Sequence, residues 1–287
     1  MTPQRVLIVG TGLLGTSVAL ALRSAGADVW LTDRDDRTLA LAVDRGAGTP
    51  GPPPRPVDLC VLAVPPGAVA DVLCDAQRAG YAAAYTDVAS VKAVPLRVAA
   101  ELGCDLSTFV GGHPMAGGER SGPQAARADL FTGRPWVLTP TPATSPAALG
   151  AARALALACG AEPVVLSPDE HDRAVAVVSH VPHLLAALAA ARLADAPAAL
   201  VALAGQGVRD VTRVAASDPD LWAGILSANS GPVAEVLDAV SADLARVAAA
   251  LRAAAVDDAV RDLLVRGRTG RGRLPDPRSQ PAPGAGR

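Results

Sequence analysis

Short apolar runs alternate with segments of helical apolar spacing through the first 166 residues of the chain. Continuous runs of Val, Ile and Leu are typical of strands that are buried on both faces, and the segments between them have the spacing of amphipathic helices. The predicted strands are 5–9, 29–32, 57–64, 82–86, 106–110, 136–139 and 162–166, and the predicted helices are 16–25, 38–45, 68–79, 95–102 and 146–159. Segment 46–56 is interpreted as a Gly/Pro loop, although a third strand is expected there. The alternation predicts an α/β fold with a doubly wound, parallel sheet.

The pattern changes after Ser167, because no strand is predicted between 169 and about 265. This region consists of Ala-, Leu- and Val-rich helical stretches of weak amphipathicity, which need burial against each other or against a second subunit. Segment 266–287 is rich in Arg, Gly and Pro and is predicted to be disordered, with an Arg/Gly tail that binds nucleic acid as the alternative. We therefore expect a sheet domain at 1–167, an all-helical C-terminal domain at 168–265 and a disordered tail after it.

Three glycines stand between the first predicted strand and the first predicted helix. In this context they are typical of a Rossmann-type dinucleotide site: Gly10 permits a tight turn, Gly12 lets the backbone approach a pyrophosphate, and Gly15 lets the helix pack closely on the strand. The free N–H groups at the start of the helix are donors for the phosphates. The expected cofactor contacts are Gly10, Gly12, Leu13, Leu14, Gly15, Asp33, Arg34, Val64 and Pro65. The sheet domain is therefore predicted to bind a dinucleotide.

The choice between NAD and NADP depends on two neighbouring residues. Asp33 ends the second predicted strand, where a carboxylate bonds the ribose 2′-hydroxyl of the dinucleotide. A carboxylate at this position repels a 2′-phosphate and so favours NAD. Arg34 follows it, and its guanidinium suits a 2′-phosphate if Asp33 turns aside. NAD is the expected cofactor, and NADP stays open.

The segment GGHPMAG at 111–117 places one imidazole between residues that control the backbone. The paired glycines are expected to let the chain approach a ligand closely, and Pro114 restricts the backbone of His113. Because 106–110 is predicted as a strand, His113 is expected just past its carboxyl end, where ligands bind in an α/β sheet. Histidine is the side chain best suited to exchange a proton near neutral pH. His113 is therefore a candidate catalytic residue, and a loop histidine with a structural hydrogen bond is the alternative.

A hydroxyl and an ammonium group follow another predicted strand end, in the segment TDVASVK at 86–92. Lys92 is the single lysine among the 26 basic residues, which indicates that this position needs a compact ammonium rather than a planar guanidinium. Ser90 and Lys92 are candidates for orienting a polar substrate and for anchoring neighbouring carboxylates. The alternative is that Asp87 or Ser90 caps a helix while Lys92 is solvated.

Five motifs, in this order, closely resemble the prephenate and arogenate dehydrogenase (TyrA) family: GTGLLG, TDVASVK, GGHPMAGGERSG, SHVPH and GVRDVTRVAASDPDLW. The resemblance covers about residues 5–260, and its middle motifs are more specific than the glycine pattern. It implies an oxidoreductase that oxidises a cyclohexadienol with NAD(P) and releases carbon dioxide as the ring becomes aromatic. The product is 4-hydroxyphenylpyruvate from prephenate or tyrosine from arogenate, so the resemblance implies tyrosine biosynthesis. A homodimer that pairs through the helical domain is also implied.

The resemblance implies roles for single residues as well. His113 matches the histidine that takes the proton of the substrate's 4-hydroxyl, and Ser90 matches the serine that orients the same hydroxyl. Arg213 matches the arginine that holds a substrate carboxylate, a task that suits a bidentate guanidinium. Arg209 is the alternative for that task. Glu119 resembles an acidic residue that gates the substrate pocket.

The helical domain adds two histidines, His180 and His183, which lie on one face of a predicted helix. His183 matches a pocket histidine of the family and is expected to bind substrate, whereas His180 is interpreted as structural. Pro182 removes a helical hydrogen bond and is expected to kink the helix. A metal site is the alternative for the pair, but no Asp, Glu or Cys obviously completes it, and no metal is expected. His171, at the helix start, is expected on the surface.

Charge and composition argue against several classes of partner and compartment. The net charge of −2 argues against a nucleic-acid-binding core. No run of about 18 uncharged apolar residues predicts a membrane span, and the chain leads directly into a strand, which predicts no signal peptide. The scattered cysteines are interpreted as free thiols in a reducing cytoplasm. They are Cys60, Cys74, Cys104 and Cys159.

Three other functions stay open. A β-hydroxyacid dehydrogenase or imine reductase shares the layout but usually needs a catalytic lysine on an interdomain helix, whereas Lys92 lies in the first domain. A dehydrogenase of an amino analogue of prephenate, in a secondary-metabolite pathway, is compatible with Gly118, which stands where family members commonly carry a larger residue. A module that binds NAD without hydride transfer is the non-enzyme alternative.

Overall fold

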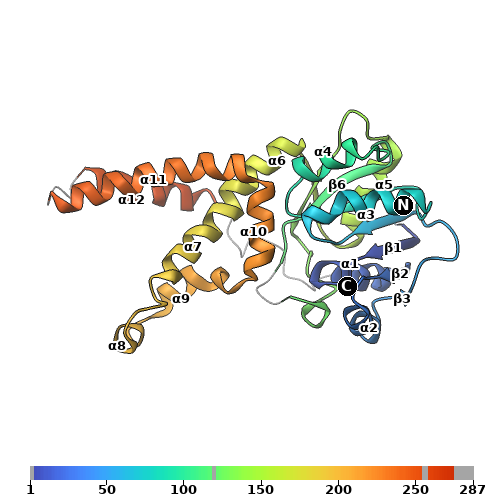
Figure 1. Ribbon diagram of the computed structural model, residues 1–287, viewed down its shortest axis with the longest axis horizontal. Helices are drawn as coiled ribbons and strands as arrows, with labels where there is room; N and C mark the ends of the chain where they lie inside the picture. The colour runs from blue at the N-terminus through green and yellow to red at the C-terminus, as the bar shows by residue number, and fades with distance from the viewer. Residues whose placement is uncertain (1–2, 118–120, 254–257, 275–287) are drawn as a thin grey trace. The chain divides into compact units, whose positions relative to one another are not determined.

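The computed structural model describes residues 3–117, 121–253 and 258–274 of the chain. Contacts between residues divide the chain into two compact units, Met1–Asn229 and Ser230–Arg287. The first unit contains the sheet, the helices around it and the first helices that follow it (Figure 1). The two units are described separately below.

The sheet has eight strands in the order β3-β2-β1-β4-β5-β6-β7-β8. The strands are β1 (Arg5–Val9), β2 (Asp28–Thr32), β3 (Thr49–Pro50), β4 (Leu59–Leu62), β5 (Tyr85–Asp87), β6 (Phe109–Pro114), β7 (Pro135–Thr139) and β8 (Glu162–Val165). Neighbouring strands are parallel except for β6 and β7, which run antiparallel. The doubly wound α/β fold is confirmed, and the antiparallel pair is a departure from the expected parallel sheet.

Helices cover both faces of the sheet (Figure 1). They are α1 (Leu13–Ser24), α2 (Asp36–Asp44), α3 (Val69–Arg78), α4 (Ala93–Glu101) and α5 (Pro146–Ala158), with short 3-10 turns η1 (Pro66–Ala68) and η2 (Pro123–Ala125). Successive side chains of a strand point to opposite faces. In β1, Ile8 packs in one core cluster with Leu22 of α1. Its neighbour Leu7 packs in the second cluster with Leu73 of α3. Two separate apolar cores therefore hold the sheet between its helices.

The Gly/Pro segment contains the missing third strand, although only two residues of it pair. Thr49 and Pro50 lie opposite Trp30 and Leu31 of β2 at the edge of the sheet. An edge strand tolerates proline because its outer N–H needs no partner. A side chain at Gly48 would run into the carbonyl of β2, so this strand needs glycine to approach its neighbour.

Strand β6 continues further than the sequence predicts. Its parallel pairing with β5 ends at Val110, the end of the predicted strand. The chain then pairs antiparallel with β7 from Gly111 to Pro114, so His113 lies opposite Val137. His113 is therefore inside a strand rather than in a loop past its end. It does lie beyond the part of β6 that pairs with the parallel strands.

One long helical segment follows the sheet, made of α6 (Pro168–Val175), the π-helical turn η3 (Ala176–His180) and α7 (Val181–Ala191). In the π-turn the N–H of Val181 bonds to the carbonyl of Ala176, five residues back. The helix is thus interrupted next to Pro182 by one inserted residue in the helical winding. The first unit ends with α8 (Ala198–Val201), α9 (Gln206–Thr212), η4 (Arg213–Ala216) and α10 (Pro219–Ala228).

The same segment, Pro168–Ala191, is the one candidate membrane span among the described residues, with 24 residues and a hydropathy of 1.8. The apolar pattern of the sequence predicted no such span, so this segment is a departure from the prediction. Its buried Asp172 accepts from the N–H groups of Lys92 and Ala93 at the start of α4, and its buried His171 bonds to His113 of β6. Of the apolar window of this segment, 33% is buried, and these bonds hold the start of the segment against the sheet region.

The second unit consists of α11 (Ser230–Arg252) and α12 (Ala259–Gly272), which lie side by side (Figure 1). Arg266 of α12 bonds to Asp243 of α11 at 3.0 Å and to Asp262 at 2.9 Å. The expected disorder from 266 onward is thus wrong up to Gly272, because i, i+4 and interhelical ion pairs support a helix there. The rest of the predicted tail, 275–287, lies outside the described residues.

Two of the four cysteines form a disulfide, which corrects the expectation of free thiols. Cys74 of α3 and Cys104, shortly after α4, are bonded, with their Cα atoms 5.3 Å apart. No sequence motif predicts a bond between these cysteines, which are 30 residues apart. They meet because both helices cover the same face of the sheet. Cys60 and Cys159 are free and buried.

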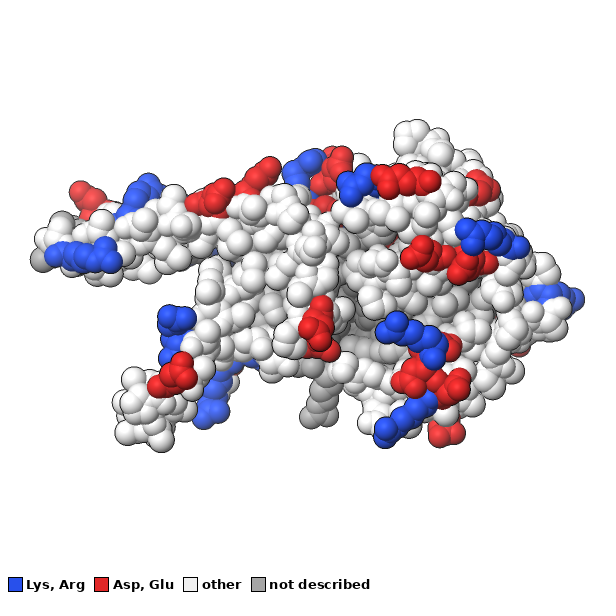
Figure 2. Space-filling model, in the orientation of Figure 1, with Lys and Arg blue, Asp and Glu red and all other residues white. Residues whose placement is uncertain are grey.

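Charged side chains of both signs are interspersed on the face seen in Figure 2. This agrees with the small net charge of −2.

Candidate active site

A buried ion pair joins the end of β5 to the start of α4. The Nζ atom of Lys92 contacts Oδ2 of Asp87, and the two residues are 3% and 1% exposed. Lys92 Nζ also donates to the carbonyl oxygen of Gly112 at 2.6 Å, and Asp87 Oδ1 accepts from the N–H of Gly112 at 2.9 Å. The ammonium and carboxylate therefore hold both sides of one peptide unit of β6, next to His113.

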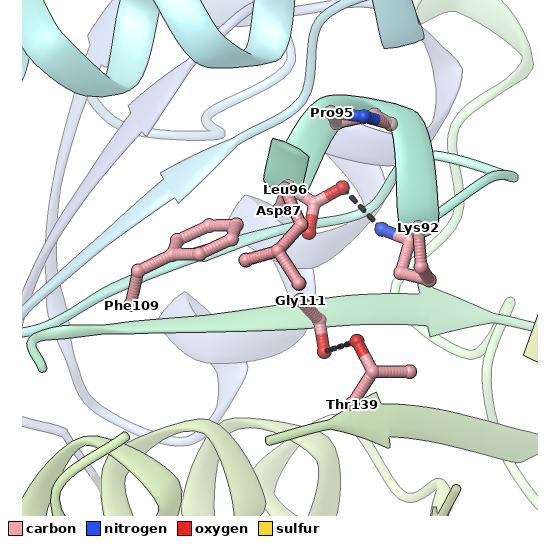
Figure 3. A pocket seen from close by; sticks show the side chains of 7 residues that line it. All are labelled: Asp87, Lys92, Pro95, Leu96, Phe109, Gly111 and Thr139. Atoms are coloured by element: carbon pink, nitrogen blue, oxygen red, sulfur yellow. Dashed lines mark hydrogen bonds and ion pairs between the residues drawn. The ribbon is translucent and has the colours of Figure 1, made fainter. Parts of the chain in front are cut away.

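A small cavity adjoins this ion pair (Figure 3). It is lined by Asp87, Lys92, Pro95, Leu96, Phe109, Gly111 and Thr139. The Thr139 hydroxyl of β7 donates to the carbonyl of Gly111 at 3.3 Å across the cavity wall. Lys92 was expected to be able to anchor a neighbouring carboxylate, and Asp87 is that carboxylate.

The paired glycines of β6 lie against atoms of the neighbouring strands and of Lys92. A side chain at Gly111 would overlap the Thr139 hydroxyl and crowd Lys92. A side chain at Gly112 would overlap the backbone oxygen of Asp87. The glycines thus permit the close approach of β6 to its own neighbours, a structural reason for them that the sequence did not indicate.

His113 is mostly buried and bonds to a second histidine. Its Nδ1 lies 2.8 Å from Nε2 of His171, which stands in the first turns of α6. The two rings meet edge to face, with centroids 5.1 Å apart. His171 is 0% exposed, so the expectation that it lies on the surface is wrong. Residues 58 positions apart are brought together because α6 turns back over the end of β6.

The carboxylate of Asp172 extends the connection from His171 to the start of α4. Asp172 Oδ1 lies 2.7 Å from His171 Nδ1 and accepts from the N–H of Lys92 at 2.9 Å. Asp172 Oδ2 accepts from the N–H of Ala93 at 2.9 Å. These backbone groups are the open N-terminal donors of α4, so Asp172 caps that helix from a distant part of the chain.

The surroundings of His113 favour its neutral form. Burial holds the pKa of its imidazole well below the usual value of 6.5, and the nearby His171, Lys92 and His180 act in the same direction. A ring with a lowered pKa is unprotonated at neutral pH and has a free lone pair. His113 can therefore accept a proton.

The π-turn and α7 place His180 and His183 on the same side of the first unit. Asn229 donates through Nδ2 to His180 Nδ1 at 3.0 Å and to the carbonyl of Asp172 at 2.8 Å. Burial lowers the pKa of His180 to about 4, so this ring is neutral too. His183 stacks on Trp222 of α10, with ring centroids 3.5 Å apart. Burial also lowers the pKa of His183.

The glycine-rich segment forms a cradle between β1 and α1. Gly10 has a φ of +97° and, like Gly15, leaves no room for a side chain: one at Gly10 would overlap the carbonyl of Ala63, and one at Gly15 would overlap the carbonyl of Gly10. At Gly12 nothing lies within 4 Å of where a side chain would begin. Gly12 is the N-cap of α1, and no side chain caps this helix. Open space before uncapped N–H donors fits a pyrophosphate.

The remaining cofactor candidates surround this cradle. Asp33 accepts from the N–H of Thr11 at 2.6 Å and from its hydroxyl at 2.8 Å, so its carboxylate is held at the end of β2. Arg34 is exposed. Val64, after β4, lies beside Gly10. The other candidates, Leu13 and Leu14 in the first turn of α1 and Pro65 at the start of η1, lie at the same end of the sheet.

The other substrate candidates are less tightly placed. Ser90 is partly buried in the turn between β5 and α4, two residues before Lys92. Arg213 is the first residue of η4, which packs against α7, and both it and Arg209 of α9 are exposed. Glu119 and Gly118 lie outside the described residues.

Sequence reasoning missed His171 and Asp172. They follow a capping box formed by Ser167 and Glu170, which signals only the start of a helix. An adjacent His and Asp in a first helical turn also fit a solvated surface, where Asp favours the helix dipole. Their role becomes visible only when α6 is placed against β6.

Comparisons with known proteins agree with this geometry. Residues 18–166 match the family model for the prephenate dehydrogenase nucleotide-binding domain. Residues 167–265 match the model for the prephenate dehydrogenase dimerization domain. A probable prephenate dehydrogenase, NovF of Streptomyces niveus, is 45% identical over 256 residues, which cover 89% of this chain and 71% of that protein.

Other relatives extend the comparison to further organisms and to solved structures. A cyclohexadienyl dehydrogenase of Zymomonas mobilis is 30% identical over 262 residues, covering 86% of this chain and 88% of that protein. The crystal structure of Aquifex aeolicus prephenate dehydrogenase with hydroxyphenyl propionate and NAD+ has a TM-score of 0.83 and 28% identity, covering 95% of this chain and 98% of that one. Synechocystis arogenate dehydrogenase has a TM-score of 0.75 at 28% identity, covering 93% and 99%.

Proposed function

Because this chain belongs to the prephenate dehydrogenase family, we propose that it oxidises prephenate or arogenate with NAD and releases carbon dioxide. The observation that carries the proposal is a neutral His113 at the junction of the sheet and the helices that follow it. It supplies the one proton acceptor that the reaction needs. The 45% identity to a probable prephenate dehydrogenase supports the same substrate class.

The proton follows a closed path in this reaction. When bound, NAD supplies the chemistry of hydride acceptance from the carbon that carries the substrate's hydroxyl group. Nε2 of His113 takes the proton of that hydroxyl as the carbon becomes a carbonyl. The ring carboxylate then leaves as carbon dioxide, its bonding electrons make the ring aromatic, and His113 returns the proton to the new phenol oxygen. No net proton is released, so a single imidazole suffices.

The remaining site residues bind and orient in this proposal. Ser90 orients the substrate hydroxyl from the turn before Lys92, and Lys92 positions His113 through its hold on β6. Arg213 binds a substrate carboxylate, with His183 on the neighbouring helix as a further contact. Glu119 is assigned to the gate of the pocket by family resemblance alone.

We assign NAD rather than NADP as the cofactor on the basis of Asp33. Its carboxylate is held by Thr11 at the end of β2, where it accepts the ribose 2′-hydroxyl and repels a 2′-phosphate. NADP is the alternative cofactor to test, because the guanidinium of the exposed Arg34 suits a 2′-phosphate. Gly12 supports the placement of the pyrophosphate, because it leaves open space at the start of α1.

A homodimer belongs to the same proposal. The match to a dimerization domain at residues 167–265 supports it, as do the exposed apolar side chains of the helices in this range. The predicted cytoplasmic location loses one of its arguments, because Cys74 and Cys104 are bonded rather than free. Light scattering of the purified protein tests the dimer, and a monomer would refute it.

The experiment that tests the proposal follows NADH absorbance with three substrates in parallel: prephenate, arogenate and the amino analogue of prephenate. We expect turnover with prephenate or arogenate and a 4-hydroxyphenyl product. Turnover confined to the amino analogue would replace the proposed substrate with that compound. NAD binding without NADH formation from any of the three would leave only a binding module.

A further inference from the structure

His171 and Asp172 connect to His113 by an unbroken line of hydrogen bonds. We propose that they are positioning residues, which hold His113 in the tautomer with its proton on Nδ1 and its lone pair on Nε2. The inference rests on the proposed function, since it explains how the proton acceptor of that reaction is prepared.

The carboxylate of Asp172 has only acceptor atoms. It accepts from the backbone N–H groups of Lys92 and Ala93, each at 2.9 Å, and its Oδ1 lies 2.7 Å from Nδ1 of His171. His171 must therefore carry its proton on Nδ1. In a neutral imidazole the other nitrogen is then bare, so Nε2 of His171 is an acceptor.

The tautomer of His171 determines the tautomer of His113. The bare Nε2 of His171 lies 2.8 Å from Nδ1 of His113, so His113 must donate from Nδ1 to form this bond. Its single proton is thereby used, and Nε2 is left with a lone pair. This is the atom that the reaction needs as its proton acceptor.

The opposite arrangement would block the reaction. If His171 carried protons on both nitrogens, it would donate to Nδ1 of His113 and leave that ring with its proton on Nε2. A His171 with both protons would be a cation, and its side chain is 0% exposed, so the neutral pair is the arrangement that buries no additional charge.

The first test replaces the ring that accepts from His113. In His171→Leu we expect kcat to fall by about 10- to 100-fold, a part of the roughly 10²–10⁴-fold that a positioned general base contributes. KM and the Kd for NAD are expected to stay within about two-fold, because no substrate contact is removed. His171→Gln keeps an acceptor oxygen near Nδ1 of His113 and is expected to recover a part of kcat.

A matched control separates positioning from loosening of the helix. Ser167→Ala removes the capping bond at the start of the same helix, α6, without touching either imidazole. Its kcat is expected to equal that of the unchanged enzyme. If Ser167→Ala lowers kcat as much as His171→Leu does, the effect comes from the helix and the positioning role is wrong.

The second test reads the tautomer without using activity. The chain contains only four histidines, so ¹⁵N NMR of the imidazole rings is tractable. In the unchanged protein at neutral pH we expect a pyrrole-type Nδ1 and a pyridine-type Nε2 for His113. In His171→Leu we expect a shift of the population toward the other tautomer. His113→Asn identifies the resonances by their loss.

The outcomes of the inference and of the proposed function are distinguishable. A pyrrole-type Nε2 in the unchanged protein, or a His171→Leu enzyme with kcat within two-fold of the unchanged one, would overturn the positioning role. Absence of NADH formation from any substrate would overturn the proposed function, while the NMR measurement would still report the tautomer. Asp172→Asn provides a further arm: if its amide turns toward His171, both rings are expected to invert their tautomers and kcat to fall with little change in KM.

Discussion

The glycine cradle and the histidine pair lie in the same compact unit but are built by different means. In the cradle, backbone contacts dictate the residues, since the carbonyls of Ala63 and Gly10 exclude any side chain at Gly10 and Gly15. In the histidine pair, the side chains of His113 in β6 and His171 in α6 contact each other, and the backbone serves only to position them. The cradle therefore tolerates few substitutions for steric reasons, whereas the pair depends on hydrogen-bond chemistry. Changes in the two regions should fail in different ways.

The largest expected effect is at His113. His113→Asn removes the proton acceptor while keeping a polar side chain in β6, so kcat is expected to fall by about 10²–10⁴-fold. The Kd for NAD should stay unchanged, because the cradle lies elsewhere. Steady-state NADH absorbance and calorimetric titration with NAD give the two numbers. A near-normal kcat would mean that another group takes the proton.

Breaking the ion pair beside His113 should mainly affect stability. Lys92→Met leaves the buried carboxylate of Asp87 without its counter-charge, which costs about 3–5 kcal/mol of unfolding free energy. The control is Arg97→Ala, which breaks an exposed pair with Glu101 on the same helix and should be nearly neutral. Urea unfolding compares the two. Equal losses of unfolding free energy would show that the buried pair contributes no more to stability than the exposed pair.

Two glycines of the cradle give a matched comparison. Gly15→Ala forces a methyl group against the carbonyl of Gly10 and is expected to lower the unfolding free energy by about 1–3 kcal/mol. Gly12→Ala meets no protein atom within 4 Å, so stability should hold while the Kd for NAD rises. Thermal unfolding and NAD titration measure both. If Gly12→Ala bound NAD normally, the pyrophosphate would not occupy this space.

The smallest expected effect is in the pH profile. Because the pKa of His113 is lowered, the ring stays unprotonated as pH falls through 6.5, the usual value for histidine. At pH 6.5, kcat/KM should thus keep more than about half of its plateau and decline only at lower pH, where the imidazole gains its proton. Initial rates between pH 5 and 8 give the curve. An acid limb centred at or above 6.5 would contradict the lowered pKa.

The first βαβ unit could be predicted from the sequence because its signals are local. Gly10, Gly15 and Asp33 all lie in one βαβ unit, so their spacing along the chain carries the geometry. The short strand β3 was harder to predict, because its two pairing residues include Pro50, which has no N–H to signal a strand. The extension of β6 was not predictable, because it depends on β7, which is a separate strand.

Contacts between distant segments could not be predicted from the sequence. His171 looked like a surface residue because its partner, His113, is far away in the chain, and burial depends on how α6 is placed. The same holds for Cys74 and Cys104, whose bond depends on α3 and α4 covering one face of the sheet. The sequence therefore indicated His113 itself, whereas its partners His171 and Asp172 became visible only from the packing of α6 against β6.

The π-helical turn at Ala176–His180 has a consequence for the alignment of the site. A regular α-helix advances by about 100° per residue, so one inserted residue rotates everything after the turn by that amount relative to α6. His171 and His183 lie on opposite sides of this turn, so the insertion sets the rotation of His183 about the helix axis relative to His171. Deleting Val178 would leave the segment helical but rotate α7 relative to α6. Circular dichroism would then record no loss of helix, although the side chains of α7 would no longer face the same side as they do now.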